Sequence, residues 1–489
     1  MTTLAMPSVH YLAILPILVL LGGSLGLMLA AAMTHGRISA RFTTTWTALS
    51  ALASVIVAFF QWHDVAQHGS TTTMAHAIAF DGFSVLAGAV ISVAVLLTSF
   101  VAHDWIARAR VVGAEFHILL LAAAAGAVMM ASANDLIVVF LGLETLSIGL
   151  YVMVAFDRHR ASSAEAALKY LLLGGFASAL FIYGAALLYG GTGSTTLTNI
   201  GYFLAHNYIA QPGVVIAGLA LIIVGFGFKV AAVPFHNWSP DVYEGAPSPV
   251  TGFMAAVVKV GAFAGVLRIV LGALATQAQA WRPVIAVLII LSTFVGAILA
   301  LVQSNVKRLL AYSSINHAGF MLLGLWSATP TGVAGTLYYV MTYAPVVVAS
   351  FAVITLVGGV NEDHNSLENL RGLARRQPLL GGALAVLLLS QAGAPFTTGF
   401  FAKFAVVRAA IDNGGVWIGV LVMIAASIAG YFYVRTVLSL YDSSAEGTPV
   451  PLPRATALVI TLGAASAVLF GVWPTPLESL AHHATLLLP

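Results

Sequence analysis

The chain has 489 residues, of which 60% are hydrophobic and only 8% are charged. A soluble domain of this length does not have that composition, so the sequence predicts a polytopic membrane protein. The net charge of +3 gives no indication of a nucleic-acid partner, and the absence of cysteine excludes disulfides, iron–sulfur clusters and thiolate metal sites from this chain. No basic residue precedes the first apolar run, so a cleaved signal peptide is not expected.

Apolar runs of transmembrane length predict an all-α fold with about 14 membrane-spanning helices. The expected helices are 9–33, 43–62, 80–101, 114–132, 134–156, 163–190, 212–238, 248–275, 281–303, 307–328, 333–360, 378–411, 414–441 and 454–472. The seventh and the twelfth helices carry glycine and proline near their middle, at 225–234 and 393–399. Because proline removes a backbone donor and clashes with the preceding turn, both helices are predicted to be broken there.

Basic residues are distributed unevenly over the loops that join these helices. The even loops hold only Arg282. The odd loops hold twelve basic residues: Arg37, Arg41, Arg108, Arg110, Arg158, Arg160, Lys307, Arg308, Arg371, Arg375, Arg376 and Arg454. Cytoplasmic loops carry the excess of lysine and arginine, so the odd loops are predicted to be cytoplasmic and both termini to lie outside.

The polar residues within the helices suggest an internal repeat. Glu144 precedes Lys229, and His317 precedes Lys403, by almost the same number of residues. Five helices separate each pair of equivalents, and because five is odd the two units would have opposite orientations, as in inverted-repeat transporters. The predicted organisation is an N-terminal three-helix segment (1–112), a first five-helix repeat (113–275), a second, inverted five-helix repeat (281–441), and a C-terminal helix and tail (442–489).

Four of the five lysines lie inside predicted helices, whereas most other basic residues are arginines. A charge at the bilayer centre costs about 2.5–3.5 kcal/mol even on insertion scales. Burial can remove the proton of a lysine, but an arginine stays charged. Lys169, Lys229, Lys259 and Lys403 are therefore predicted to handle protons, and Lys307 is expected to start a helix in a basic loop.

The depth of each group suggests its role. Glu144 is either a structural carboxylate or the group that controls the charge of Lys229, because a nearby anion favours the protonated amine and separation favours proton release. Lys259 lies about 16 Å along its helix, too deep to reach water easily, and is predicted to be a central relay. Lys403, beside the second break, is predicted to lead to an outer exit.

Three further positions have two readings each. Lys169 lies near the cytoplasmic end of its helix, where it either passes protons inward or extends to water. His236 and His317 are either proton shuttles or hydrogen-bonded core histidines. His236 shares a helical face with Lys229 if the seventh helix continues through Pro234.

The remaining charged residues have weaker signals. Asp241 and Glu244 are either an entry funnel or ordinary loop acids, and Arg268, Arg408 and Arg435 are expected to be helix-end or packing charges. The sequence has no metal-ligand pattern, nucleophile–base pair or redox-cofactor motif. Proton movement is therefore predicted in this chain, and electron transfer is not.

Four segments have a recognisable pattern. Residues 229–251 read KVAAVPFHNWSPDVYEGAPSPVT and lead to Lys259, and the others are LETLS at 143–147, KRLLAYSSI at 307–315 and GFFAK at 399–403. These segments resemble the antiporter-like subunits of respiratory complex I, the proton-translocating NADH–quinone oxidoreductase. The resemblance covers about 115–410. The DVYEGAPSPV segment and the lysine in the twelfth helix are most similar to the group called subunit N, equivalent to mitochondrial subunit 2, whereas the sister subunit M carries a glutamate in that helix.

The resemblance implies a role for each matching residue. Glu144 and Lys229 would form the coupled ion pair and Lys259 the central relay. Lys403 would be the terminal lysine that faces the exit, and Lys169 the additional lysine of the sixth helix.

The resemblance also implies an enzyme, a set of partners and a location. NADH would be oxidised and quinone reduced elsewhere in the complex, with flavin and iron–sulfur clusters in partner subunits and no cofactor in this chain. The neighbours would be other membrane subunits, including subunit M and the small subunit K. The location would be the bacterial plasma (inner) membrane, with both termini on the periplasmic side.

Two departures and two alternatives stand beside this interpretation. The twelfth-helix break reads GAPFTTG where many relatives have GIPPTAG, and Ala402 replaces a frequent glycine. These changes affect local geometry but keep the break and the lysine.

A subunit of a multi-subunit cation/proton antiporter shares the same core, and a pure scaffold would use the polar residues only for packing. The VYxGAP segment favours the complex I subunit.

Overall fold

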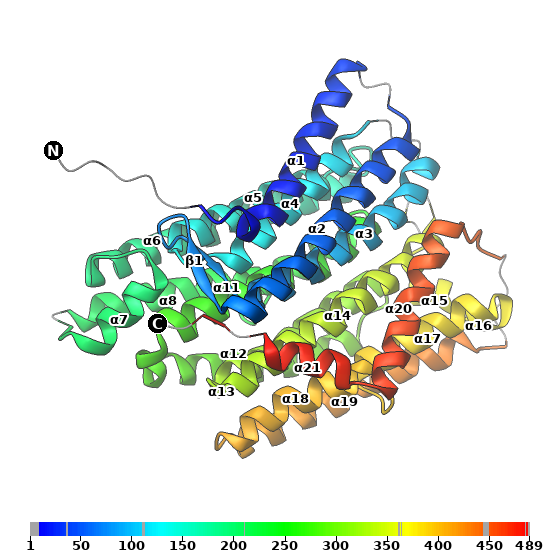
Figure 1. The fold of residues 1–489 in the computed structure, drawn as a ribbon. Helices are drawn as coiled ribbons and strands as arrows, with labels where there is room; N and C mark the ends of the chain where they lie inside the picture. The colour runs from blue at the N-terminus through cyan, green and yellow to red at the C-terminus, as the bar shows by residue number, and fades with distance from the viewer. Residues whose placement is uncertain are drawn as a thin grey trace.

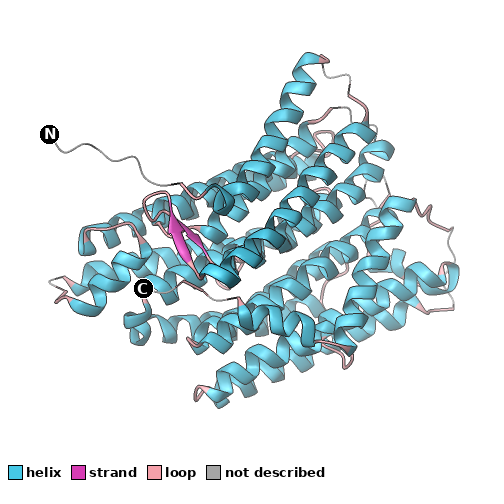
Figure 2. Ribbon diagram, in the orientation of Figure 1, coloured by secondary structure: helices cyan, strands magenta, loops and turns pink. Residues whose placement is uncertain are grey.

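The computed structural model describes residues 9–35, 38–109, 113–209, 211–359, 362, 364–443, 449–484 and 486–487. Arg37 and Arg110, which entered the predicted orientation, lie outside these residues. The described chain is nearly all helical, as Figures 1 and 2 show, so the predicted all-α membrane fold is confirmed.

The N-terminal segment contains three long helices and one short hairpin. The helices are α1 (Tyr11–Met33), α2 (Ala40–His68) and α3 (Gly82–Ala109), and the hairpin pairs β1 (Thr71–Thr73) with β2 (Ile78–Phe80). The hairpin was not predicted, because strands this short do not produce an alternating pattern in the sequence.

The middle of the chain contains the first broken helix. Its elements are α4 (Glu115–Ser132), α5 (Leu136–Val154), α6 (Ala161–Thr192), α7 (Leu197–His206), α8 (Pro212–Lys229), α9 (Trp238–Gly245), α10 (Ser248–Phe253), the π-helical turn η1 (Met254–Val258), α11 (Lys259–Leu267) and the π-helical turn η2 (Arg268–Ala273). The predicted seventh helix ends at Lys229, and the chain turns before α9 begins. The prediction that this helix is broken is therefore confirmed.

The second half contains the other broken helix. Its elements are the short 3₁₀ turn η3 (Ala275–Gln277), α12 (Ala278–Leu301), α13 (Val306–Ser327), α14 (Pro330–Val357), α15 (Leu367–Leu370), α16 (Leu373–Arg376), α17 (Pro378–Ala392), α18 (Thr398–Asp412), α19 (Val416–Leu440), α20 (Arg454–Val472) and α21 (Thr475–His483). Gly393 ends α17 with a left-handed backbone (φ +87°), which glycine adopts without a steric penalty. The predicted break in the twelfth helix is thus confirmed.

Twelve helical segments in the described ranges are long and apolar enough to cross a membrane. The other two predicted spans correspond to α13 and to the broken pair α17–α18. These do not meet the same length and composition limits, so the count of 14 stays a prediction.

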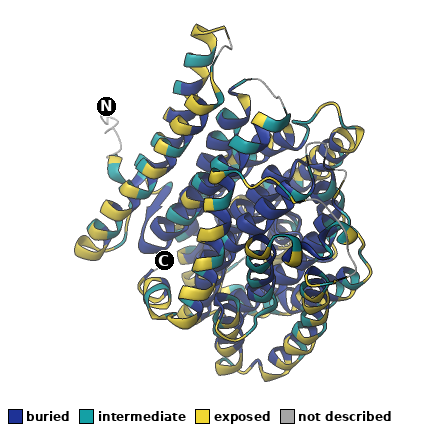
Figure 3. Cartoon of the chain, turned by 90° about the vertical axis from the view of Figure 1, so that its right-hand side faces the viewer, coloured by how far each residue is buried: buried dark blue, intermediate teal, exposed yellow. Residues whose placement is uncertain are grey.

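The run from α10 to η2, α13 and α14 form the enclosed centre of the bundle, and Figure 3 shows the buried residues gathered in its middle. Of the 18 most apolar consecutive residues in each helix, 100% are buried in the run from α10 to η2 and 89% in α14. The corresponding share is only 33–39% in α1, α2 and α20. Helix α20 returns to the N-terminal segment, where Thr456 donates from its backbone (3.0 Å) and its hydroxyl (2.6 Å) to Asp104 on α3. The enclosed centre is where the buried lysines lie.

Two helix pairs repeat the same geometry at one constant spacing along the chain. Leu136 N donates to Thr195 O, and Val306 N donates to Asn365 O, with donor and acceptor both displaced by the same number of positions. The same displacement relates the close contact of Gly126 with α5 to that of Gly296 with α13. These contacts support a repeat of the α4–α5 pair in α12–α13, whereas the opposite orientation of the two units stays a prediction.

Gly126→Ala and Gly296→Ala are expected to reduce the stability of the folded chain. A Cβ at Gly126 would lie 2.7 Å from Gly142 O, and one at Gly296 would lie 2.8 Å from Tyr312 O, so the helices must separate. Overpacking of this kind costs about 1–3 kcal/mol. The measurement is the thermal midpoint of the chain in native membranes. The control, Gly175→Ala, has open space around it and is expected to change nothing or stabilise slightly; an equal loss in all three variants would contradict the helix-contact explanation.

Candidate functional site

Lys229 is the last residue of α8, where the break leaves its ammonium group inside the protein. The side chain is 3% exposed. Its Nζ donates to Ser147 Oγ at 2.7 Å and to Tyr170 OH at 3.3 Å, and it lies over the ring of Tyr170. Two hydroxyls and an aromatic face therefore solvate this ammonium group.

Glu144 lies one turn before Ser147 on α5, on the same side of the bundle as Lys229. Its carboxylate accepts a hydrogen bond from Ser178 Oγ on α6. Within the described structure Glu144 makes no direct ion pair with Lys229, and the Ser147 hydroxyl that accepts from Lys229 donates to Leu143 O. The predicted coupled pair is thus brought to one site, with its two charges separated.

Lys259 begins α11, directly after the π-helical turn η1. The residue is 4% exposed, and its ammonium group has no carboxylate partner in the described chain. Its Nζ donates to Ser314 O on α13 at 2.8 Å and to Val230 O at 3.4 Å. Because Val230 directly follows Lys229, Lys259 connects the first helix break to α13. Turns of π-helix often occur at functional positions in helices.

His317 on α13 is held between two tyrosines. Its Nδ1 lies 2.7 Å from Tyr339 OH on α14, and its Nε2 lies 3.1 Å from Tyr433 OH on α19. Tyr433 OH also pairs with Ser313 Oγ, one turn from His317. Since each tyrosine hydroxyl both donates and accepts, either tautomer of the imidazole is satisfied.

Lys403 on α18 points back into the second helix break. Its Nζ donates to Ala392 O, the last residue of α17, at 2.6 Å, and it lies 5.1 Å from the ring centre of Phe320. A small cavity lined by His317, Gln391 and Gly399 lies beside this break. The predicted position of Lys403 beside the break is therefore confirmed, and His317 lines the cavity next to it.

Lys229, Lys259, His317 and Lys403 form a row of buried polar residues, and Lys169 lies outside this buried row. Its Nζ pairs with Glu165 and with Asp241, each at 2.8 Å, and its side chain is 42% exposed. Arg308 joins the same group through Asp241 (2.7 Å) and Glu244 (2.8 Å). Burial alone would raise the pKa of Asp241, but hydrogen bonds from Lys169 and Arg308 hold it below its ordinary value. The two acids are thus part of one charged cluster with Lys169.

His236 does not share a helical face with Lys229, which corrects the expectation that α8 continues through Pro234. The helix ends at Lys229, and His236 lies half-buried in the following turn. Its Nδ1 is enclosed and has no hydrogen-bond partner in the described structure.

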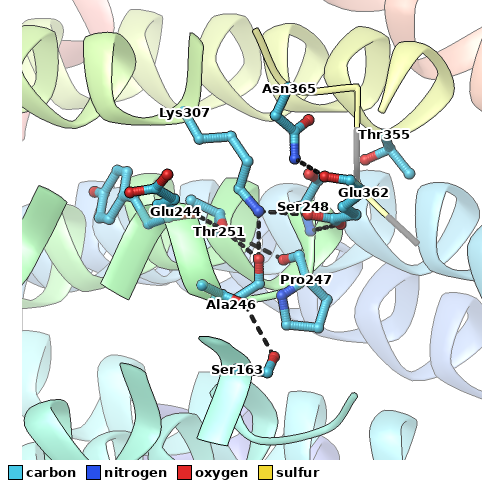
Figure 4. Close-up of polar contacts among 12 residues, drawn as sticks. Ser163, Glu244, Ala246, Pro247, Ser248, Thr251, Lys307, Thr355, Glu362 and Asn365 are labelled. Atoms are coloured by element: carbon cyan, nitrogen blue, oxygen red, sulfur yellow. Dashed lines mark hydrogen bonds and ion pairs between the residues drawn. The ribbon is translucent and has the colours of Figure 1, made fainter. Parts of the chain in front are cut away.

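Lys307 lies in the first turn of α13, so the expected helix start is confirmed, but its side chain is not in a solvated loop. Its side chain is fully buried, and its Nζ donates to Glu362 Oε2 and to Ala246 O, each at 2.5 Å (Figure 4). Glu362 also accepts from Ser248 N, the start of α10. Burial by itself raises the pKa of Glu362, but the adjacent ammonium of Lys307 lowers it below its ordinary value. The sequence contained no signal for this pair, because Glu362 lies far along the chain in a polar loop.

Sequence reasoning also missed the tyrosines that solvate the row, because a tyrosine in an apolar helix is not distinguished from a packing residue. Tyr170, Tyr243, Tyr339 and Tyr433 are all buried. Tyr243 OH lies 3.2 Å from Ser314 Oγ, beside the carbonyl that Lys259 contacts. The expectation for Arg268 is consistent with its ion pair to Asp81 (2.6 Å), which lies apart from the row.

Comparison with known proteins shows the family to which the chain belongs. Residues 133–429 match the model of a family described as NADH:quinone oxidoreductase/Mrp antiporter, TM. The chain is 42% identical over 392 residues to NADH-quinone oxidoreductase subunit N of Mycobacterium tuberculosis, covering 78% of this chain and 73% of the relative. It is 37% identical over 504 residues to subunit N 1 of Sorangium cellulosum, covering 97% and 98%. A chain of respiratory complex I from Thermus thermophilus superposes with a TM-score of 0.82 at 33% identity, covering 96% and 99%.

Glu362→Gln is expected to destabilise the protein by about 3–5 kcal/mol, because it leaves the charge of Lys307 buried without a counter-ion. The folded state lowers the pKa of Glu362, so its contribution is present above the ordinary value near 4.5 and is lost as the pH falls through the folded-state value. The difference in thermal midpoint between wild type and variant should therefore shrink on acidification. The matched control is Glu165→Gln, whose exposed ion pair with Lys169 should contribute little. A difference independent of pH would contradict this account.

Proposed function

Because the chain belongs to the subunit N group of the NADH:quinone oxidoreductase/Mrp antiporter family, we propose that its buried lysines carry protons across the membrane while partner subunits carry the electrons. The chain is a proton-translocating membrane-arm subunit of a redox-driven complex. The observation that carries the residue assignment is the buried polar row from the first helix break to the second, built on Lys229, Lys259, His317 and Lys403.

The row supports a direction for proton movement. The exposed cluster around Lys169 and Asp241 would be the cytoplasmic intake, with Lys169 as an additional relay. His236, in the turn after α8, would be a possible relay between this cluster and Lys229. Protons would then reach Lys259 and leave through Lys403.

Glu144 and Lys229 would act as the switch at the start of the row. In this structure the two groups make no direct ion pair: Glu144 accepts from Ser178, and Lys229 donates to Ser147 and Tyr170. Approach of Glu144 would reload Lys229 with a proton, and separation would release the proton towards Lys259.

The remaining assignments follow from membership of such a complex. This chain would be its non-redox subunit, and flavin and iron–sulfur clusters would belong to partner subunits. Neighbours would include subunit M and the small subunit K. The chain would lie in the bacterial plasma (inner) membrane with both termini on the periplasmic side, as the distribution of basic residues supports.

Lys259→Met and Lys259→Arg are both expected to lower donor-driven proton pumping in the assembled complex by at least about tenfold, since a positioned proton carrier contributes roughly 10²–10⁴-fold. Quinone reduction should slow alongside. Arginine keeps the charge and donors of the lysine but does not release its proton. The measurement is pumping and quinone reduction in membranes, after quantifying the assembled complex.

The arginine variant separates the proposed role from a structural one. If Lys259→Arg pumps at the wild-type rate, a fixed charge at this position is sufficient and the relay assignment fails. If Lys259→Met also pumps normally, the row is not the proton route at all.

A further inference from the structure

A cavity of about 450 Å³ lies between α3, α14 and α20, with α21 across its outer end. The three helices are joined near their cytoplasmic ends, where Thr456 donates to Asp104 and Arg108 donates to a backbone carbonyl of α14 at 3.3 Å. Near the middle of the membrane, a Cβ on Gly463 of α20 would lie 3.1 Å from Pro345 O of α14. Above this level the helices diverge, and the cavity occupies the space between them.

The cavity has the depth of one bilayer leaflet. Its wall on α3 is a single helical face that runs from Leu86 to Leu97 and includes Val90 and Val93. At 1.5 Å per residue this face is about 16 Å long, which is about half of the ~30 Å thickness of the hydrocarbon core. By the predicted orientation of the chain, this is the outer leaflet.

The lining of this cavity is mostly apolar, and its few polar side chains already have partners. Thr342 and Ser466 donate to carbonyls of their own helices, and Thr398 pairs with Ser390 at 3.1 Å. A water molecule needs several polar partners, so this space is poorly suited to ordered water. An empty space of this size would deprive its walls of dispersion contacts, and folded proteins contain few such voids. The cavity therefore fits an apolar occupant.

The shape of the cavity favours a slim chain over a protein helix. Val93 on α3 and Leu462 on α20 line the cavity and are exposed, so an occupant can enter sideways from the bilayer. A helix with its side chains is about 10–12 Å across and would need a groove that is open along its whole length. The contacts at Gly463 and at the cytoplasmic ends close this groove halfway across the membrane. A lipid acyl chain satisfies both limits.

A second cavity, of about 660 Å³, continues the same line towards the outer surface. Gly82, one helical turn before Leu86 on α3, lines this second cavity, and Leu480 of α21 lines both. Its walls also carry the indole of Trp62 on α2 and the imidazole of His483 on α21. Tryptophan is enriched at the level of lipid headgroups, and indole N–H groups and protonated imidazoles donate to phosphate oxygens. An apolar cavity with a polar outer end has the form of a phospholipid.

We propose that these two cavities bind one phospholipid of the outer leaflet. Its acyl chain lies between α3, α14 and α20, and its headgroup lies between α2 and α21. The chain extends to Thr398, the first residue of α18, so the lipid packs against the second helix break.

The test uses the assembled complex, reconstituted into vesicles of phosphatidylethanolamine and phosphatidylglycerol. A small fraction of the phosphatidylglycerol carries a photoreactive diazirine in one acyl chain. Labelled peptides are mapped by mass spectrometry after exchange against unlabelled lipid. A lipid enclosed by three helices leaves more slowly than one on an open surface, so we expect at least about tenfold more adducts on 86–97 than around Phe59 on the exposed face of α2.

Val90→Trp and Ala89→Phe fill the cavity from its α3 wall and are each expected to lower the adducts on 86–97 by at least about tenfold. Two positions are used so that the result does not depend on the assembly of one variant. The control is Leu52→Trp, on the exposed face of α2 outside both cavities, which should leave the adducts unchanged. His483→Leu removes a polar headgroup contact and should lower the adducts at least about threefold.

The other outcomes overturn the inference. If wild type shows no adducts on the α3 face, or if the filling variants keep them, no lipid chain lies in the cavity. Equal loss of the α3 and α2 adducts during exchange would mean ordinary contact with bulk lipid. Unchanged adducts in His483→Leu would mean that the second cavity does not hold the headgroup. Adducts formed only by a prenyl quinone with the same photoreactive group would assign the cavity to a quinone tail.

Discussion

The two helix breaks impose the constraint on which the rest of this structure depends. Inside a bilayer no solvent is available to a backbone carbonyl that a broken helix leaves unpaired, so the protein must supply a donor. Lysines supply several of these donors here: Lys259 reaches Val230 O after the first break, and Lys403 reaches Ala392 O at the second. Lys307 does the same for Ala246 O between α9 and α10. The breaks therefore depend on the lysines for hydrogen-bond donors, and the buried lysines depend on the breaks for carbonyl acceptors.

This dependence relates the charge of a lysine to the conformation of the backbone beside it. A hydrogen bond from an ammonium group is roughly twice as strong as one from a neutral donor. Loss of the proton from Lys259 or Lys403 would weaken the contact that closes a break, and opening of a break would remove a group that stabilises the charge. Proton occupancy and break geometry are thus coupled by the same contacts, which is the property that a proton-translocating subunit requires.

The repeated helix pairs use one geometry for different chemistry. At the spacing that relates the α4–α5 pair to α12–α13, Ser147 on α5 corresponds to His317 on α13, and Glu144 corresponds to Ser314. The sequence had paired Glu144 with His317, which is out of register by nearly one helical turn and therefore on another part of the helix. Ser147 contacts Lys229 in the first pair, and Ser314 contacts Lys259 through its carbonyl in the second. The two halves meet at Lys259, which lies in the most enclosed helix of the bundle.

The sequence by itself determined the membrane class, the positions of both helix breaks and the burial of Lys229, Lys259 and Lys403, because hydropathy, proline and isolated charges act locally along the chain. Only the tertiary structure decided which groups those lysines contact. These arrangements involve residues that are far apart in sequence. Examples are the separation of Glu144 from Lys229, the pairing of Lys307 with Glu362, and the placement of His317 between two tyrosines. Such contacts depend on how helices pack and on the exact rotation of each one, and a one-residue change in register turns a side chain by about 100°. Local patterns contain no information at that precision.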